Sequence, residues 1–252
     1  MEIALGLDVS TKAIGLSLAS VDEDNIKVLL MTHLQLHTPK NMEETEKFFA
    51  KSKLFEEKLR DFSQYPITRV IIEEPSMKNN VQVSNMLLRF NGMIAQVVYN
   101  VLNIVPCFIA SHDARTFAFP DLLSVRKYQK HGSIISTHHI KKTLNNNDLT
   151  LFGNYPWDCS KKHVLLNKVS EMYPSLPWIY NQKGELSNKN FDVIDSLICI
   201  LGYYPYMKYK DTEPTVSEWS EYQSSDGKYT IFDYNIQFCD KTFTKRIEIV
   251  AD

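Results

Sequence analysis

The sequence lacks the features that identify several common classes of protein. Its four cysteines lie far apart and form no CxxC pair, which argues against a zinc site or a disulfide framework. No apolar run approaches the ~18 residues that a membrane helix needs, and the N-terminus shows no pattern of a secretory signal. We therefore expect a cytoplasmic protein whose cysteines are reduced.

Glycine is scarce, and the charges nearly balance. Only 8 of the 252 residues are glycine, and the formal net charge is −2, so no overall basic character indicates a nucleic-acid partner. The charge is unevenly distributed, however. The segment from Arg126 to Lys168 contains eight Lys or Arg and two acidic residues. Such an excess is typical of a phosphate-binding surface and equally of a solvated loop region.

Hydrophobic patterning predicts a mixed β-sheet in the first half of the chain. Hydrophobic residues make up 44% of the sequence, enough for a substantial core. Apolar runs predict strands at 2–8, 14–21 and 26–36, and their short connections favour an antiparallel meander. An amphipathic helix, capped by Asn41, is expected to run to about residue 63.

The pattern then changes to alternating strands and helices. Strands are predicted at 68–74 and 105–110, with a long helix at 81–102 between them. Strand–helix–strand order implies right-handed parallel crossovers, so the meander should continue into α/β units. We therefore expect an α/β fold with a mixed five-stranded sheet flanked by helices.

The second half is less regular. Residues 116–160 form a basic, Asn-rich stretch that we interpret as an insertion of loops and a short helix, and helices are predicted at 161–173 and 191–207. A polar linker at 210–227 precedes alternating segments that predict a C-terminal β-hairpin. The predicted domains are 1–209, including the 116–160 insertion, and a 210–252 extension.

Acidic residues at the ends of apolar elements are the unusual feature of this sequence. Asp8 ends the first strand, Glu73 and Glu74 end the fourth, and Asp192 and Asp195 begin a late apolar helix. Each has an ordinary explanation, as a turn residue, a solvent-exposed strand end or a helix N-terminal acid. Because adjacent strand residues face opposite sides, only one of the two glutamates can join Asp8.

Considered together, these acids predict a metal site. If the first and fourth strands are neighbours, the carboxylates can converge, and a cluster of four needs cations to neutralise it. Oxygen ligands favour Mg²⁺ or Mn²⁺. Two such ions ~3.5–4 Å apart can clamp a phosphodiester.

Four segments carry a resemblance to a known family. "LGLDVSTKAIGLSL", "VIIEEPSMKNN", "KKHVLLNKV" and "FDVIDSLICI" occur in this order, and they resemble motifs of the RuvC family of Holliday-junction resolvases, within the ribonuclease-H-like nucleases. The resemblance covers about 1–115 and 161–207.

The resemblance implies a ribonuclease-H-like fold and a homodimeric endonuclease that cuts branched DNA with two Mg²⁺ ions, for which Mn²⁺ would substitute. It places the ligands at Asp8, Glu73, Asp192 and Asp195, with Lys161 approaching the scissile phosphate. Together with the basic segment, it leads us to expect a DNA-binding set at Lys78, Arg126, Lys127, Lys130, Lys141, Lys142 and Lys162. Arg115 follows the 105–110 strand and could approach the site, although helix capping is its expected role.

Two alternatives come from other functional classes. "GLDVSTKAIG" also resembles the first phosphate loop of actin-like ATPases and sugar kinases, but those proteins need two such domains and usually a second glycine-rich loop. The other alternative is a non-catalytic scaffold that binds branched DNA or a protein. A scaffold has no reason to retain all four acids, and we therefore favour the nuclease.

Overall fold

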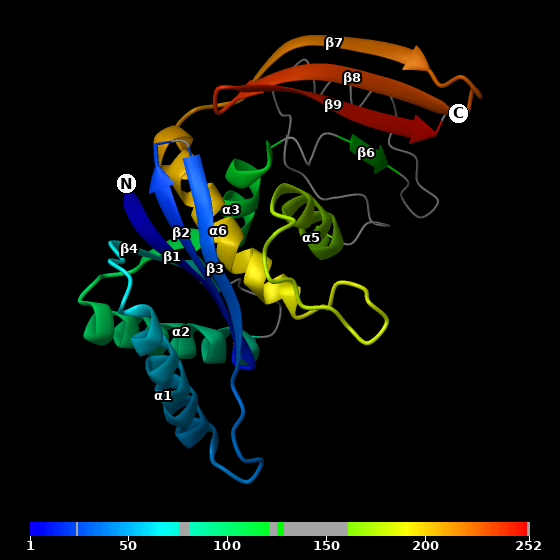
Figure 1. Ribbon diagram of the computed structural model, residues 1–252. Coiled ribbons are helices and arrows are strands. Elements are labelled where there is room, and N and C mark those ends of the chain that lie inside the picture. Colours follow the sequence, from blue (N-terminus) through cyan, green and yellow to red (C-terminus); the bar gives the residue numbers. More distant parts are fainter. Residues whose placement is uncertain (24, 76–80, 121–124, 129–160, 251–252) are drawn as a thin grey trace. The chain divides into compact units, whose positions relative to one another are not determined.

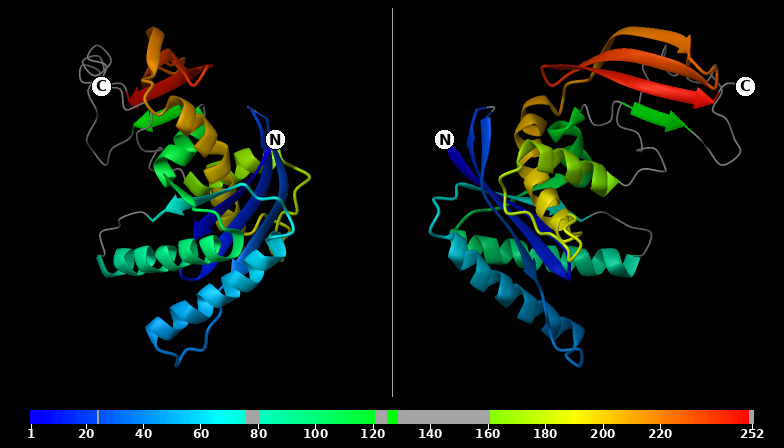
Figure 2. Two further views of the ribbon diagram at one scale, coloured as in Figure 1. Left: turned by 90° about the vertical axis from the view of Figure 1, so that its left-hand side faces the viewer. Right: turned by 45° about the vertical axis from the view of Figure 1, so that its right-hand side comes forward.

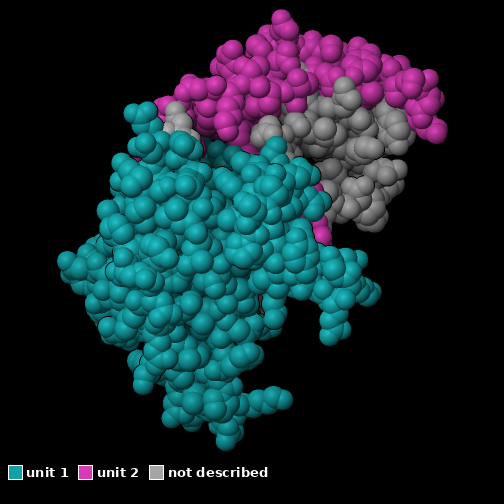
Figure 3. Space-filling view, in the orientation of Figure 1, with its two compact units in different colours: residues 1–118, 165–204 teal, residues 119–164, 205–252 magenta. Residues whose placement is uncertain are grey.

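The protein divides into two compact units. The computed structural model describes residues 1–23, 25–75, 81–120, 125–128 and 161–250. One unit comprises residues 1–118 and 165–204, and the other comprises residues 119–164 and 205–252 (Figure 3). The predicted domain boundaries, 1–209 and 210–252, stay a prediction.

A five-stranded mixed sheet forms the centre of the first unit (Figure 1). The first three strands pair antiparallel as predicted, and β1, β4 and β5 pair in parallel, in the order β3-β2-β1-β4-β5. The strands are β1 (Glu2–Val9), β2 (Ala13–Asp22), β3 (Asn25–Gln35), β4 (Arg69–Glu74) and β5 (Cys107–Ala110). The predicted α/β fold class is confirmed, and the first and fourth strands are neighbours, as the predicted metal site requires.

Two helices cover one face of this sheet. They are α1 (Glu44–Phe62) and α2 (Val81–Leu102). Their buried aromatic and aliphatic residues, among them Phe55 and Phe90, pack against alternate residues of β1, β2 and β4 such as Leu5 and Leu7. The prediction that Asn41 caps α1 was wrong, because the reciprocal capping box is formed by Glu43 and Glu46.

The opposite face is covered by α6 (Asn190–Tyr209), which is nearly all apolar and has twelve buried residues (Figure 2). Further helices are α3 (Ser111–Ala118) and α5 (Lys161–Met172). Leu165, Leu166 and Val169 of α5 are buried. Helix α3 was not predicted as a helix. No helix in the described ranges is both long and apolar enough to span a bilayer.

The second unit contains a four-stranded sheet in the order β6-β9-β8-β7. Its strands are β6 (Val125–Tyr128), β7 (Thr215–Gln223), β8 (Tyr229–Phe238) and β9 (Lys241–Val250). The predicted C-terminal hairpin is confirmed. Cys239 and Asp240, the two residues between β8 and β9, both have positive φ, as a tight two-residue hairpin turn requires.

This second sheet also differs from the sequence-based expectation. Much of the predicted linker at 210–227 is the edge strand β7, which pairs with β8. The described part of the predicted insertion contributes β6, which pairs in parallel with β9. β6 pairs with a strand far along the chain, and β7 is mostly exposed, so neither has the apolar alternation that predicts a strand from local sequence.

Candidate metal centre

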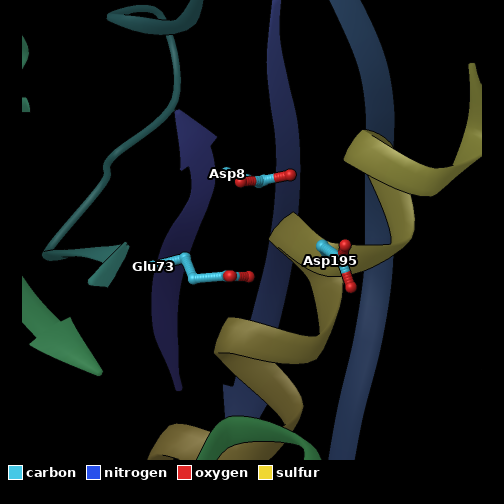
Figure 4. Close-up of side chains that lie close together, drawn as sticks. All are labelled: Asp8, Glu73 and Asp195. Carbon is cyan, nitrogen blue, oxygen red and sulfur yellow. The ribbon is translucent and has the colours of Figure 1, made fainter. Parts of the chain in front are cut away.

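Three carboxylates from distant parts of the chain meet in the first unit. Asp8 lies near the end of β1, Glu73 lies in β4, and Asp195 lies in the second turn of α6. Each offers a ligand oxygen, and these oxygens lie within 4.8 Å of one another. Figure 4 shows the three side chains directed toward a common space. Three carboxylates arranged in this way can bind one cation together.

The pairing of β1 with β4 explains the first two positions. Leu7 is in register with Ile72 in this parallel pair, which places Asp8 and Glu73 side by side at the next position. Leu7 and Ile72 point into the core beneath α1 and α2, so Asp8 and Glu73 project from the opposite face. Glu74 is exposed, and as the next residue along the strand it faces the opposite side of the sheet from Glu73. Glu73 is therefore the glutamate that joins Asp8.

Close packing of α6 on the sheet brings in Asp195. A β-carbon added at Gly15 would lie 1.9 Å from the backbone oxygen of Asp192, and one added at Gly6 would lie 2.0 Å from that of Ser196. A side chain at either position would therefore push the helix away from the sheet. The hydroxyls of Ser17 and Ser196 also share a buried hydrogen bond of 2.7 Å.

One guanidinium group lies against this cluster. Arg115 Nη2 donates a hydrogen bond of 3.0 Å to Oδ1 of Asp195, whose side chain is only 3% exposed. Arg115 lies on α3, directly after β5, and its predicted helix-capping role missed this contact. Arg115 follows β5 at the sheet edge where the acids lie, and this position in the sequence is the signal that could have placed it beside them. The guanidinium of Arg115 thus forms an ion pair with one of the three carboxylates.

The carboxylates of the cluster affect the pKa of a neighbouring thiol. Cys199 lies one helical turn beyond Asp195 and is fully buried. Burial raises its pKa well above the usual value, and the negative charges of Glu73 and Asp8 raise it further. This thiol therefore stays protonated at neutral pH, and it is packed in the core.

The structure places the fourth predicted acid differently. Asp192 Oδ2 lies 3.2 Å from Nε2 of His33, a side chain of β3 that is 8% exposed. Asp192 is not among the residues whose ligand oxygens lie within 4.8 Å of one another. Sequence reasoning overlooked His33. The strand pairing places it in one row with Asp8, because Asp8 is in register with Gly15 and Gly15 with His33.

Four of the predicted phosphate-contacting residues fall on described elements. Lys161 is the first residue of α5, and Lys162, beside it, is exposed. Arg126 and Lys127 lie on β6. Lys78, Lys130, Lys141 and Lys142 lie outside the described residues. Their roles in binding DNA stay predictions.

Comparisons with known proteins found no sequence match and solved structures of limited similarity. No protein-family profile matches the chain, and no curated protein matches it in sequence. Thermus thermophilus RuvC in complex with a Holliday-junction substrate is similar at a TM-score of 0.49 and 11% identity, covering 81% of this chain and 95% of that chain.

Two further solved structures are similar at lower scores. Fowlpox virus resolvase in complex with Holliday-junction DNA has a TM-score of 0.33 and 14% identity, covering 84% of this chain and 99% of the other. An exopolyphosphatase from Cytophaga hutchinsonii has a TM-score of 0.37 and 10% identity, covering 82% and 90%. At these values the likeness distinguishes neither family nor activity. The chain is an α/β protein with a mixed five-stranded sheet and a carboxylate cluster on one face.

Proposed function

We propose that this protein is a metal-dependent endonuclease that cuts phosphodiesters in branched DNA. The observation that carries the proposal is the convergence of Asp8, Glu73 and Asp195, whose ligand oxygens lie within 4.8 Å of one another. Carboxylates that are partly or fully buried are costly unless cations or hydrogen bonds compensate them. Three of them meeting from separate segments is an arrangement suited to holding cations.

The donor set fits hard divalent cations. All three groups offer carboxylate oxygens, which Mg²⁺ and Mn²⁺ prefer over the nitrogen and sulfur ligands of zinc sites. When bound, a pair of such cations lowers the pKa of a bound water and stabilises negative charge on phosphate oxygens.

The acids and the lysines of the site would have separate roles. Asp8, Glu73 and Asp195 would hold the cations, and Asp8, which lies on the central strand β1, is the natural shared ligand. Asp192 would complete the set from the preceding turn of α6. Lys161 and Lys162, at the start of α5, would contact the DNA phosphates together with the basic 126–168 segment.

Branched DNA is the substrate that the sequence resemblance favours. The four RuvC-like segments include all four proposed ligands, and the same resemblance leads us to propose a homodimer. Symmetric cutting of a junction requires two active sites, which a dimer would supply.

Neighbouring glutamates give a matched test of the site. We expect Glu73→Gln to lower Mg²⁺-dependent nicking of a synthetic four-way junction by more than about 100-fold, since even outer-shell changes cost 10–100-fold. Junction binding in EDTA should persist. Glu74→Gln removes the same charge at the adjacent, exposed position and should cut normally.

The substrate assay compares four-way, flap, fork and linear DNA with Mg²⁺, Mn²⁺ or EDTA. Equal nicking by the Glu73→Gln variant and the wild type would contradict the site. ATP hydrolysis without DNA cleavage would favour the actin-like alternative. Specific junction binding without cleavage in either metal would favour the scaffold.

A further inference from the structure

A pocket of about 640 Å³ lies within the first unit. Its wall on the sheet side comes from β3 and the residues that follow, including Met31, His33 and His37. Ile179 and Lys189 come from the segment that precedes α6, and Val193 comes from α6 itself. This volume is in the usual range for a small-molecule site.

The pocket combines a buried floor with a basic rim. Met31 and Val193 are almost fully buried, whereas His37 and Lys189 are exposed. Such a lining suits a flat, weakly polar ring system that carries an anionic group at one end. A nucleotide has this chemistry, with its base suited to the floor and its phosphate to the rim.

Hydrogen bonds fix the shape of the pocket before any ligand arrives. The buried Asn190 accepts a hydrogen bond from the backbone N–H of Ile179 and donates to the Ile179 carbonyl. Its amide also donates to the carbonyl of Ser187. The side chain of Asn190 therefore ties the 179–187 segment to the start of α6, and the pocket is preformed.

The strand register places this pocket next to the cluster. Asp8, Gly15 and His33 lie in one row across three adjacent strands, so two strand spacings, about 10 Å, separate the backbones at Asp8 and His33. Asp192, three residues before Asp195 on α6, contacts His33, which lines the pocket. A DNA strand with a phosphate at the cluster would therefore bring a neighbouring nucleotide to the pocket.

We propose that the pocket receives one unstacked base of the DNA strand beside the bond that is cut, with a flanking phosphate at Lys189 and His37. This inference rests on the proposed nuclease function and specifies its substrate. A branch point supplies bases that have lost stacking neighbours, so such a base enters a pocket at lower cost than one in a continuous duplex. The pocket would thus help to select branched DNA.

The experiment uses 2-aminopurine, whose fluorescence rises when it leaves the base stack. The cut in a four-way junction is first mapped with Mg²⁺, and the probe is then placed at each flanking position and measured with the full-length protein in EDTA. We expect a several-fold rise at one position. Ile179→Trp, which fills the pocket, and Lys189→Glu should each remove at least half of that rise.

Lys183→Glu is the matched control, because Lys183 is exposed in the same segment and does not line the pocket. It should leave the signal unchanged. Circular dichroism checks that Ile179→Trp is folded, and Lys189→Glu provides a second variant that leaves the floor intact.

Three outcomes would overturn the proposal. If the wild type nicks the junction but no position shows a rise that depends on Ile179 and Lys189, the pocket proposal fails and the nuclease stands. If free deoxynucleoside monophosphates bind with that dependence but the DNA probe does not respond, the occupant is a free nucleotide. If the wild type neither binds nor cuts junctions, both proposals fail.

Discussion

At the scale of single residues, the pair formed by Arg115 and Asp195 governs the charge of the cluster. Asp195 is 3% exposed and Arg115 is 22% exposed, and the hydrogen bond between them is 3.0 Å long. A buried ion pair adds little net stability, but removing one partner leaves the other charge buried without compensation. Arg115 therefore both holds Asp195 in place and limits the repulsion among the three acids.

We expect Arg115→Met to lower the free energy of unfolding by about 3–5 kcal/mol in EDTA, because it leaves the carboxylate of Asp195 buried without this partner. The double variant Arg115→Met/Asp195→Asn should recover part of that loss, since it removes the uncompensated charge as well. Urea denaturation of the two single variants and the double variant measures the coupling. Losses that simply add would show that the two residues are not coupled.

At the scale of elements, the contact between α6 and the sheet decides whether the acids meet. Gly6 and Gly15 allow the helix backbone to approach β1 and β2, and Ser17 bonds to both Ser196 and the Val193 carbonyl across the same contact. The positions of Asp195 and Asp192 therefore depend on residues that have no proposed catalytic role. A small outward movement of α6 would separate Asp195 from Asp8 and Glu73.

Gly15→Ala tests this dependence. Its new methyl group would meet the Asp192 carbonyl at 1.9 Å, and we expect a loss of about 1–3 kcal/mol in unfolding free energy from overpacking. Nicking should fall as well, because α6 carries Asp195.

Gly92→Ala is the matched control, since its new methyl group has no neighbour within 4 Å on α2. We expect this variant to raise the unfolding free energy by roughly 0.5–1 kcal/mol, because alanine stabilises a helix interior more than glycine does. Urea denaturation measures both changes. Equal stability of the Gly15→Ala variant and the wild type would show that α6 does not need this close approach.

At the scale of the whole molecule, cation binding should be linked to folding. The three acids are distant in sequence and lie together only in the folded chain, so a cation that needs all of them binds the native state and stabilises it by mass action. Repulsion among the carboxylates is greatest when no cation is present. The folded protein should therefore be less stable in EDTA than in Mg²⁺.

We expect saturating Mg²⁺ or Mn²⁺ to raise the unfolding free energy by about 2.7 kcal/mol when the free ion is at 100 times its Kd. Thermal unfolding across a metal titration measures this, independently of any DNA substrate. Glu73→Gln should reduce the shift, and Glu74→Gln should retain it. A wild-type melting temperature that does not respond to either ion would contradict the metal site.

Much of the fold could be predicted from local patterns. The long helix at 81–102 matches α2, and five strands were placed within about two residues of their observed bounds, because apolar periodicity and turn residues act over short distances. The acids at the ends of these elements were visible for the same reason. The sequence predicts a linker where β7 lies, because the segment is mainly polar. It is a strand through its pairing with β8.

The sequence by itself indicated most of the helices and strands of the first unit and the acids at their ends, because each depends on residue type and local spacing. Only the tertiary structure decided which acid meets which partner. Arg115 joins Asp195 across 80 positions, and His33 takes Asp192 across 159. The physical reason is that a side chain's partner is set by strand register and by the glycine contacts that seat α6, and both join segments far apart in the chain.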